Sequence, residues 1–339
     1  MIQNEVSTDI IAHTITRPPE KTGITPWSFL VCRPILLLLY LWPGLATADH
    51  QDKQAIAHIA LLYPTVSKQY SGMFTQLIKG IKSVPGYHFI PRRIDANTTP
   101  ARLLKWSKEK KIVAYIALGQ TTYRLVKAMD RELPLIAGGM VATPPGISGI
   151  SLSGDPEIFF RQLQLLNPSS NRVFFIHSRE NNGWVVKRAR KISAKYGIEF
   201  VALQVEDIKQ ATLQYKIVLK SLVARTDAIW IPLDNVAPLH LLLPEILKIS
   251  WNKHITVFSN NLMHARRGTL FALYPDHYKQ GRRLVALLQR KLNNHASPDA
   301  LYPSVDLKTA VNIRTAAHLN LRYNRTMIKK FDQVYPAYR

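Results

Sequence analysis

Cysteine is almost absent from this chain of 339 residues. The one cysteine, Cys32, lies within the first 48 residues, ahead of a pattern that predicts proteolytic processing. A mature chain without this segment has no thiol. Its sequence therefore excludes disulfide bonds, thiol chemistry and cysteine-based metal sites.

Acidic residues are also scarce. The chain has 22 Asp and Glu against 45 Lys and Arg, which gives a net charge of +23. The first 48 residues hold three residues of each sign, so the basic excess belongs to the part that follows. An apolar fraction of 47% with 20% charged residues is typical of a globular chain, and the length suits two domains that each bury a core.

A long apolar run is missing from the N-terminal region. The stretch Ile35–Trp42 follows Arg33 and is too short for a bilayer, which needs about 20 apolar residues. Pro43-Gly44 and then Ala46-Thr47-Ala48 come next. A positive flank, a short apolar stretch and an A-x-A site are the parts of a secretory signal peptide. We expect cleavage after Ala48 and a periplasmic protein, with an uncleaved anchor or a chance apolar run as the alternatives.

The usual catalytic motifs are absent. The sequence contains no G-x-S-x-G elbow, P-loop, H-E-x-x-H or G-x-G-x-x-G. None of its 11 histidines pairs with another at metal-ligand spacing. His177-Ser178-Arg179-Glu180 places a base, a hydroxyl and an acid side by side, but sequence neighbours rarely form a catalytic group. The sequence therefore predicts no enzyme, no cofactor and no metal site.

What is present is a repeated alternation of short apolar runs and amphipathic segments, which predicts parallel strands crossed by helices. In the first half we expect strands at 58–63, 87–94, 112–118 and 133–137, and helices at 71–82, 100–109 and 121–129. In the second half we expect strands at 172–177, 199–205, 228–233 and 255–258, and helices at 182–196, 208–224 and 238–249. The last of these strands is predicted to complete its lobe.

These two units predict an α/β fold of two Rossmann-like lobes with parallel sheets. The Pro- and Gly-rich segment 143–150 is interpreted as the first crossing between the lobes. A basic helix ending near Leu292 would return to the first lobe, and the tail from Tyr302 to the second. Three crossings form a hinge that suits closure on a ligand. The predicted boundaries are 1–48 for the signal peptide, 53–147 plus 264–300 for lobe 1, and 148–263 plus 301–339 for lobe 2.

Several short sequence words occur in an order that resembles the substrate-binding proteins of ABC transporters. The words are Ile147-Ser148-Gly149-Ile150-Ser151, Leu166-Asn167-Pro168, Arg172-Val173-Phe174-Phe175, the run 226–235, Leu273-Tyr274-Pro275-Asp276 with Gly281, Val311-Asn312-Ile313 with Ala316-Ala317, and the closing segment 331–336. The resemblance implies the type I periplasmic-binding architecture and a family that includes binders of tryptophan and related amino acids.

Ligands of open parallel sheets bind outside the carboxyl ends of the strands. This rule selects polar residues in the loops after the predicted strands. They are Thr65, Gln69, Tyr70, Gln120, Thr121 and Thr122 in the first lobe, and Ser178, Asn181, Asn182, Asp234, Asn235 and Asn260 in the second. Tyr63, Tyr70 and Trp184 are aromatic neighbours that would either stack on a flat ligand or pack at the lobe surface.

Each candidate has a structural alternative. The turn Gly119–Thr122 opens a helix and would hold a carboxylate on its free N–H groups, or Thr121 would simply cap the helix. Asn181 and Asn182 have the same two interpretations. Asp234 follows a buried strand and would pair with a ligand ammonium, or serve as a turn residue. A carboxylate site on one lobe and Asp234 on the other suit an amino-acid-like ligand.

The basic residues are spread over the whole chain, in clusters at 108–111, 187–191, 266–267, 282–283, 290–291 and 329–330. A nucleic-acid face would concentrate them, so no nucleic-acid partner is expected. They are either solvated helix faces or a source of weak contact with an anionic membrane or envelope surface. The expected partners are a small-molecule ligand and an ABC permease. A membrane receptor that uses the protein as its sensory subunit, and a ligand-free envelope scaffold, remain as alternatives. We expect a monomer.

Overall fold

The computed structural model describes residues 57–129, 132–294 and 298–336. The predicted signal peptide, its cleavage site and Cys32 lie outside these residues. All of these described residues belong to one compact unit. Within the described ranges, no helix combines the length and the apolar character that crossing a membrane requires.

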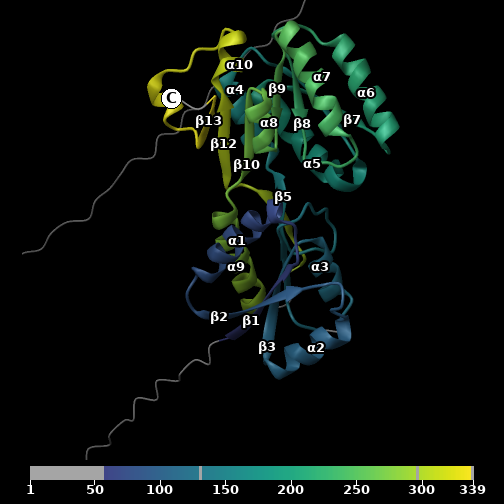
Figure 1. Cartoon of the computed structure of the whole chain (residues 1–339), viewed down its shortest axis with the longest axis vertical. Coiled ribbons are helices and arrows are strands. Elements are labelled where there is room, and N and C mark those ends of the chain that lie inside the picture. Colours follow the sequence, from purple (N-terminus) through teal and green to yellow (C-terminus); the bar gives the residue numbers. More distant parts are fainter. Residues whose placement is uncertain (1–56, 130–131, 295–297, 337–339) are drawn as a thin grey trace, which may run out of the picture. The chain divides into compact units, whose positions relative to one another are not determined.

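The first sheet has six parallel strands in the order β11-β5-β4-β3-β1-β2 (Figure 1). Its strands are β1 (Ala57–Pro64), β2 (Tyr87–Ile94), β3 (Ile112–Leu118), β4 (Leu135–Gly138), β5 (Gly149–Gly154) and β11 (Leu301–Ser304). Its helices are α1 (Lys68–Lys82), α2 (Pro100–Glu109), α3 (Gln120–Lys127) and α9 (His277–Asn293). We call this sheet with its helices the first lobe.

The second sheet has seven strands in the order β13-β12-β10-β9-β8-β6-β7, with β12 antiparallel to β10. Its strands are β6 (Arg172–His177), β7 (Glu199–Gln204), β8 (Asp227–Ile231), β9 (Thr256–Ser259), β10 (Phe271–Pro275), β12 (Leu307–Asn312) and β13 (Gln333–Tyr335). Its helices are α4 (Pro156–Leu166), α5 (Arg179–Ile192), the 3-10 turn η1 (Ser193–Tyr196), α6 (Ile208–Ser221), α7 (Leu239–Asn252), α8 (Leu262–Arg267), α10 (Ile313–His318) and α11 (Arg325–Ile328). We call this sheet with its helices the second lobe.

Each sheet is buried on both faces, as parallel sheets require. In β1, Ala60 and Leu62 belong to one apolar cluster, whereas Ile59 and Leu61 belong to the cluster on the opposite face. Side chains alternate between the two faces of a strand, and both faces of this sheet are covered by apolar clusters. Positions on either face of such a strand are therefore apolar, which gives the continuous apolar runs of the sequence. In the second sheet Trp230 of β8 is 1% exposed and stacks on Phe159 of α4 at 4.5 Å between ring centroids.

Helices α1 and α9 approach closely at two glycines, although they are far apart in the sequence. A Cβ atom at Gly281 would collide with the carbonyl oxygen of Leu77, and one at Gly80 would collide with that of Tyr278. The absent side chains therefore allow α9, which returns late in the chain, to lie against the first helix of the lobe.

Most of the predicted elements are confirmed. Strands 87–94 and 112–118 and helix 100–109 have the predicted bounds, and several other elements differ at their ends by a few residues. The prediction that 255–258 completes its lobe is wrong, since β10, β12 and β13 extend the second sheet.

The interpretation of 143–150 as a crossing is also wrong. This segment is a turn inside the first lobe, and it leads into β5, where Gly149 pairs with Ala137 of β4. The sheets divide the chain differently from the predicted boundaries, because β5 and β11 belong to the first sheet and β10 to the second.

The chain passes between the two sheets three times, as predicted. The crossings lie between β5 and α4, between β10 and α9, and between β11 and β12. Backbone hydrogen bonds join them: Asp155 N donates to Ser304 O at 2.9 Å, and Asp276 N donates to Asp306 O at 2.8 Å. The crossing after β11 is therefore hydrogen-bonded to the crossing after β5 and to the crossing after β10.

Candidate functional site

The loops after β6 and β8 meet around one carboxylate, that of Asp234. Ser178 lies directly after β6, and Asp234 lies three residues after β8. The donors to the Asp234 oxygens are Ser178 N at 2.8 Å, Ser178 Oγ at 3.0 Å, Asn182 Nδ2 at 2.8 Å, Asn181 Nδ2 at 3.1 Å and Val236 N at 3.1 Å. A carboxylate offers about four lone-pair positions, so donors of this chain already satisfy this group.

This network fixes the start of α5. Ser178 is the N-cap of that helix, and its Oγ accepts a hydrogen bond from Asn181 N at 3.3 Å. The capping interpretation of Asn181 and Asn182 is therefore wrong, since both lie in the first turn of the helix. Asn182 is 2% exposed and also donates to Leu233 O at 3.1 Å. Asp234 thus acts as the acceptor that holds two loops together, and a ligand ammonium would have to share it.

The two remaining second-lobe candidates lie in different environments. Asn235 is exposed, and its Oδ1 accepts from Asn181 Nδ2 at 2.9 Å. Asn260 follows β9 and is 6% exposed, and its Oδ1 accepts from the indole of Trp230 at 2.6 Å. Asn235 therefore presents a surface that a ligand can reach, whereas Asn260 satisfies a core tryptophan.

In the first lobe the turn Gly119–Thr122 opens α3. Gly119 is the N-cap, with φ 85°, a left-handed conformation that suits glycine. The prediction that Thr121 caps this helix is wrong, since Thr121 lies within its first turn and the cap has no side-chain hydrogen bond. Gln120 and Thr121 are exposed, whereas Thr122 is fully buried. The groups of this turn that a ligand can reach are therefore its backbone N–H groups and the side chains of Gln120 and Thr121.

The other first-lobe candidates follow β1. Thr65 is exposed and donates from its backbone N to Ile94 O at 3.0 Å, which joins it to the end of β2. Gln69 and Tyr70 lie in the first turn of α1, and their side chains are outside the part that the structure describes. Thr65 is thus the candidate of this loop whose side-chain position is defined.

A cavity of about 520 Å³ lies beside the loop that contains Ser178, and no sequence pattern indicated it. The residues lining it are Thr143, Pro144, His177, Arg179, Gly183, Trp184, Val186, Lys187, Arg190, Ala202 and Gln204. Trp184, which the sequence suggested would stack on a flat ligand or pack at the lobe surface, lines this cavity. Its indole N–H is buried and has no hydrogen-bond partner within the described ranges. Burial lowers the pKa of His177. Three cations on α5 therefore face a cavity with an unused donor, a combination suited to an acidic group on a ligand.

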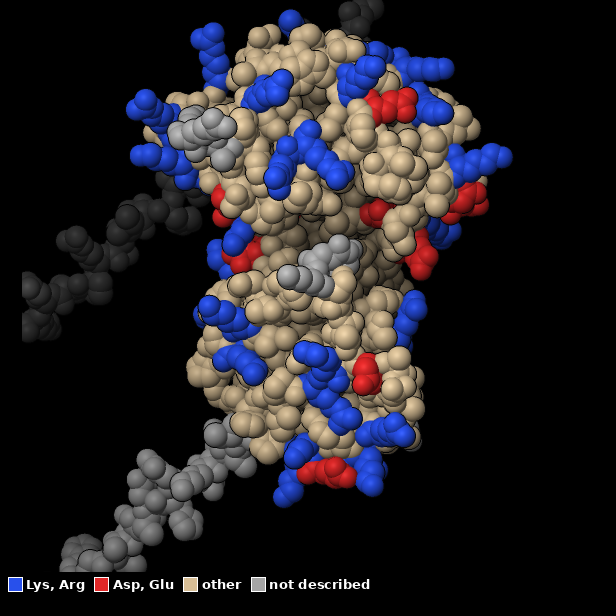
Figure 2. Space-filling model, in the orientation of Figure 1, with Lys and Arg blue, Asp and Glu red and all other residues tan. Residues whose placement is uncertain are grey.

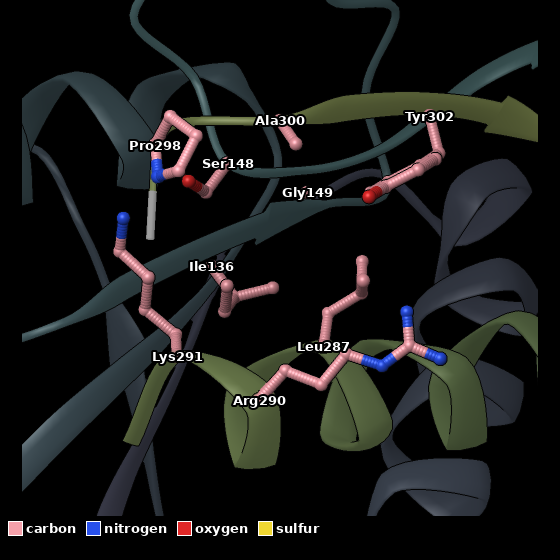
Figure 3. A pocket seen from close by; sticks show the side chains of 9 residues that line it. All are labelled: Ile136, Ser148, Gly149, Leu287, Arg290, Lys291, Pro298, Ala300 and Tyr302. Carbon is pink, nitrogen blue, oxygen red and sulfur yellow. The ribbon is translucent and has the colours of Figure 1, made fainter. Parts of the chain in front are cut away.

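A second cavity, of about 250 Å³, lies between α9 and the edge of the first sheet (Figure 3). Leu287, Arg290 and Lys291 project from α9, with Ala300 and Tyr302 on the opposite side. Lys291 forms an ion pair with Asp299 at 3.4 Å. None of the predicted ligand residues lines this cavity, which places it apart from the loops at the carboxyl ends of the strands.

Replacing Thr122 with valine tests whether its hydroxyl has a role. The Oγ1 atom is buried and has no hydrogen-bond partner within the described ranges. Because an unpaired buried hydroxyl costs free energy, we expect Thr122→Val to raise the free energy of unfolding by about 1 kcal/mol. Urea unfolding followed by circular dichroism measures this change. A loss of more than about 1 kcal/mol would instead reveal a partner for the hydroxyl.

Comparison with protein-family models and with curated proteins finds no match. Comparison with solved structures does find matches. One is an ABC domain in complex with L-Trp from Streptococcus pneumonia, 14% identical, with a TM-score of 0.52 over 83% of this chain and 100% of that one. Another is the ligand-free, open form of a substrate-binding protein with adhesive properties from Clostridium difficile, 15% identical, with a TM-score of 0.58 over 84% of this chain and 100% of that one.

A third match is a conserved domain protein from Vibrio cholerae, 13% identical, with a TM-score of 0.52 over 82% of this chain and 99% of that one. At these identities the likeness concerns the arrangement of the backbone. All three match over essentially their whole length, so the likeness includes both sheets and the crossings between them. The chain therefore has the fold of the type I periplasmic binding proteins, two α/β lobes joined by three crossings, as its sequence predicted.

Proposed function

We propose that this protein is an exported solute-binding protein that closes its two lobes on a small, amino-acid-like ligand and presents it to an ABC permease. The observation that carries the proposal is the fold, which it shares over their full length with a structure that contains L-Trp and with a substrate-binding protein. In such a protein the ligand shifts the population toward the closed form, which the membrane partner recognises. Binding and release, without a chemical step, then account for the function.

The ligand class follows from the residues at the carboxyl ends of the strands. The α3 turn offers backbone N–H groups at a helix N-terminus, where the helix dipole favours an anionic group such as a carboxylate. In the second lobe Asp234 is the one acid among the twelve candidate residues, and the exposed Asn235 lies beside it. These groups support an ammonium site next to Asn235, in which the ammonium shares the Asp234 carboxylate with the donors that already bind it.

Export is part of the proposal and rests on the sequence. The predicted signal peptide ends at Ala48, ahead of the compact unit that starts at Lys53. A periplasmic location would place the lobes where a permease can receive the ligand. N-terminal sequencing of the protein recovered from a periplasmic extract tests this step, and we expect Asp49 as the first residue.

A thermal-shift screen tests ligand binding. The protein is purified by unfolding and refolding, which removes bound ligand, and is screened against amino acids, nucleosides, sugars and small anions. Ligand at about 100 times its Kd should stabilise the folded state by about 2.7 kcal/mol. We expect a rise of several degrees in Tm for an aromatic or branched amino acid.

A variant within the candidate site tests where the ligand binds. Asn235→Ala removes the exposed amide beside Asp234 and is expected to weaken the response to the amino acid that binds. A Tm that stays constant with every compound, for a protein with a cooperative unfolding transition, would contradict the solute-binding proposal.

A further inference from the structure

Helices α7, α8 and α10 surround a cavity in the second lobe, which we call the arginine pocket. Its volume is about 670 Å³. It is lined by Leu247, Trp251, Arg266, Arg267, Gly268, Asn312, Arg314, Thr315, Tyr335 and Pro336. Three of these residues are arginines and none is acidic. Figure 2 shows Lys and Arg side chains spread over the face of the second lobe that carries α8.

The three arginines have no acidic partner in the described part of the chain. Arg172, Arg188 and Arg283 each form an ion pair with an aspartate elsewhere in the structure. In contrast, the guanidinium groups of Arg266, Arg267 and Arg314 form no ion pair or hydrogen bond with any described residue, and all three arginines line the pocket. With 22 acidic residues for 45 basic ones, many cations of the chain lack an acidic partner, and these three are set apart because they line one cavity.

Hydrogen bonds between α8 and α10 hold the arginines around one cavity. Asn312 Nδ2 donates to Ala265 O at 2.9 Å, and Thr315 Oγ1 donates to Gly268 O at 2.9 Å. These bonds fix the start of α10, which carries Arg314, beside the end of α8, which carries Arg266 and Arg267. They use the hydroxyl hydrogen of Thr315 and one of the two amide hydrogens of Asn312, whereas each guanidinium group has five N–H donors. The guanidinium groups are therefore the main free donors at this cavity.

An aromatic side chain forms one wall of the pocket. Trp251 is 38% exposed and lies 5.9 Å from the guanidinium carbon of Arg314, measured to the ring centroid. His318 stacks on the indole at 3.6 Å between centroids, and its Nε2 lies 2.8 Å from Trp251 O. These contacts hold the tryptophan in position. An apolar surface therefore lies beside the cations and can contact the organic part of a ligand.

The histidine next to the pocket, His264, is buried. Burial, together with the charge of Arg267, lowers the pKa of His264 to about 4. His264 therefore remains neutral at physiological pH and adds no charge to the pocket. The cations available to an incoming anion are the three arginines.

We propose that the arginine pocket binds a phosphate group carried by an organic molecule. Guanidinium groups are planar, weakly hydrated and able to bind phosphate oxygens in pairs, and three of them match a multiply charged anion better than a single carboxylate. The site is separate from the candidate ligand residues of the second lobe. The ends of α7 and α8, which carry Trp251 and Arg267, lead into the starts of β9 and β10, whereas those candidates lie beyond the ends of β6, β8 and β9. The phosphate can belong to a lipid headgroup in a membrane or to a free organic phosphate.

The experiment compares two triple variants of the full-length chain, each with three fewer positive charges. The first is Arg266→Gln, Arg267→Gln and Arg314→Gln. The control is Lys209→Gln, Lys216→Gln and Lys220→Gln, three exposed positions of α6. Equilibrium dialysis with radiolabelled pyrophosphate measures binding of free phosphate. Co-sedimentation with phosphatidylglycerol vesicles, against phosphatidylcholine vesicles, measures binding to lipid phosphate.

We expect saturable binding of pyrophosphate by the native protein, with one site per chain, at least tenfold weaker in the arginine variant and unchanged in the lysine control. The same pattern with phosphatidylglycerol vesicles would identify the lipid as a source, and its absence there would identify the free phosphate. If both triple variants lost the same affinity, the binding would depend only on the net charge of the protein, and the proposal would be overturned. The absence of saturable binding to either probe would overturn it as well.

Discussion

Asp234→Asn is expected to lower the free energy of unfolding by about 2–3 kcal/mol, because the new amide nitrogen would face donors instead of accepting from them. Five hydrogen-bond donors from four residues converge on this carboxylate. Hydrogen bonds to a charged acceptor contribute about 1.5–3 kcal/mol each, and the variant can keep some of them through its remaining oxygen. Urea unfolding of the native and variant proteins measures the difference.

Asn235→Ala is the matched control for stability. Its side chain is exposed and shares one hydrogen bond with Asn181, so we expect a change within about 0.5 kcal/mol. An Asp234→Asn protein as stable as the native one would show that the network adds nothing to the fold. If Asp234→Asn also keeps full affinity for the amino acid found in the screen, the proposed ammonium contact is wrong.

The sequence located this network but not its internal bonding. The rule that ligands bind beyond the carboxyl ends of parallel strands selected both Ser178 and Asp234, which are 56 residues apart, and the structure brings them within 3.0 Å. The number of donors on Asp234 depends on side-chain directions in two loops. No periodicity encodes these directions, which is why the pairing by Asn181 and Asn182 was not predicted.

The fold was predictable where burial is complete and less so at the crossings. Strand Ile112–Leu118 is apolar throughout and buried except at Val113, because helices cover both faces of its sheet. Pro144-Pro145-Gly146 marks a turn equally well inside a lobe or between lobes, and the pairing of Gly149 with Ala137 decides between them. Strand β12 has the polar pair Lys308-Thr309 directly after its first residue, Leu307, so the sequence shows no regular apolar alternation that would indicate its antiparallel pairing with β10.

The sequence indicated only some of the residues of the arginine pocket. In the sequence, Arg266-Arg267 is one of several basic clusters, and nothing in its pattern distinguishes it from the others. Arg314 lies 47 residues further on, and a hydrogen bond from Thr315 to Gly268 brings it to the same cavity. A uniform distribution of basic residues along the sequence is therefore compatible with a concentrated group in space.

Gly281→Ala is expected to lower the free energy of unfolding by about 3 kcal/mol, because its Cβ would overlap the backbone of α1. The nearest atom is the carbonyl oxygen of Leu77, and Ile81 N would lie at 3.0 Å. A backbone atom cannot rotate away, so the two helices must separate. Differential scanning calorimetry, or urea unfolding, measures the loss.

Gly72→Ala, on the same helix α1, is the matched control. A Cβ there meets no atom within 4 Å, and alanine is a better helix former than glycine by about 1 kcal/mol, so we expect this variant to be more stable than the native protein. Opposite signs for the two glycines would locate the effect in the contact between α1 and α9. Because α9 begins directly after the crossing that follows β10, this contact anchors one of the three crossings to the first lobe. A Gly281→Ala protein with native stability would show that the helices can move apart without cost, and that the crossing is not held in this way.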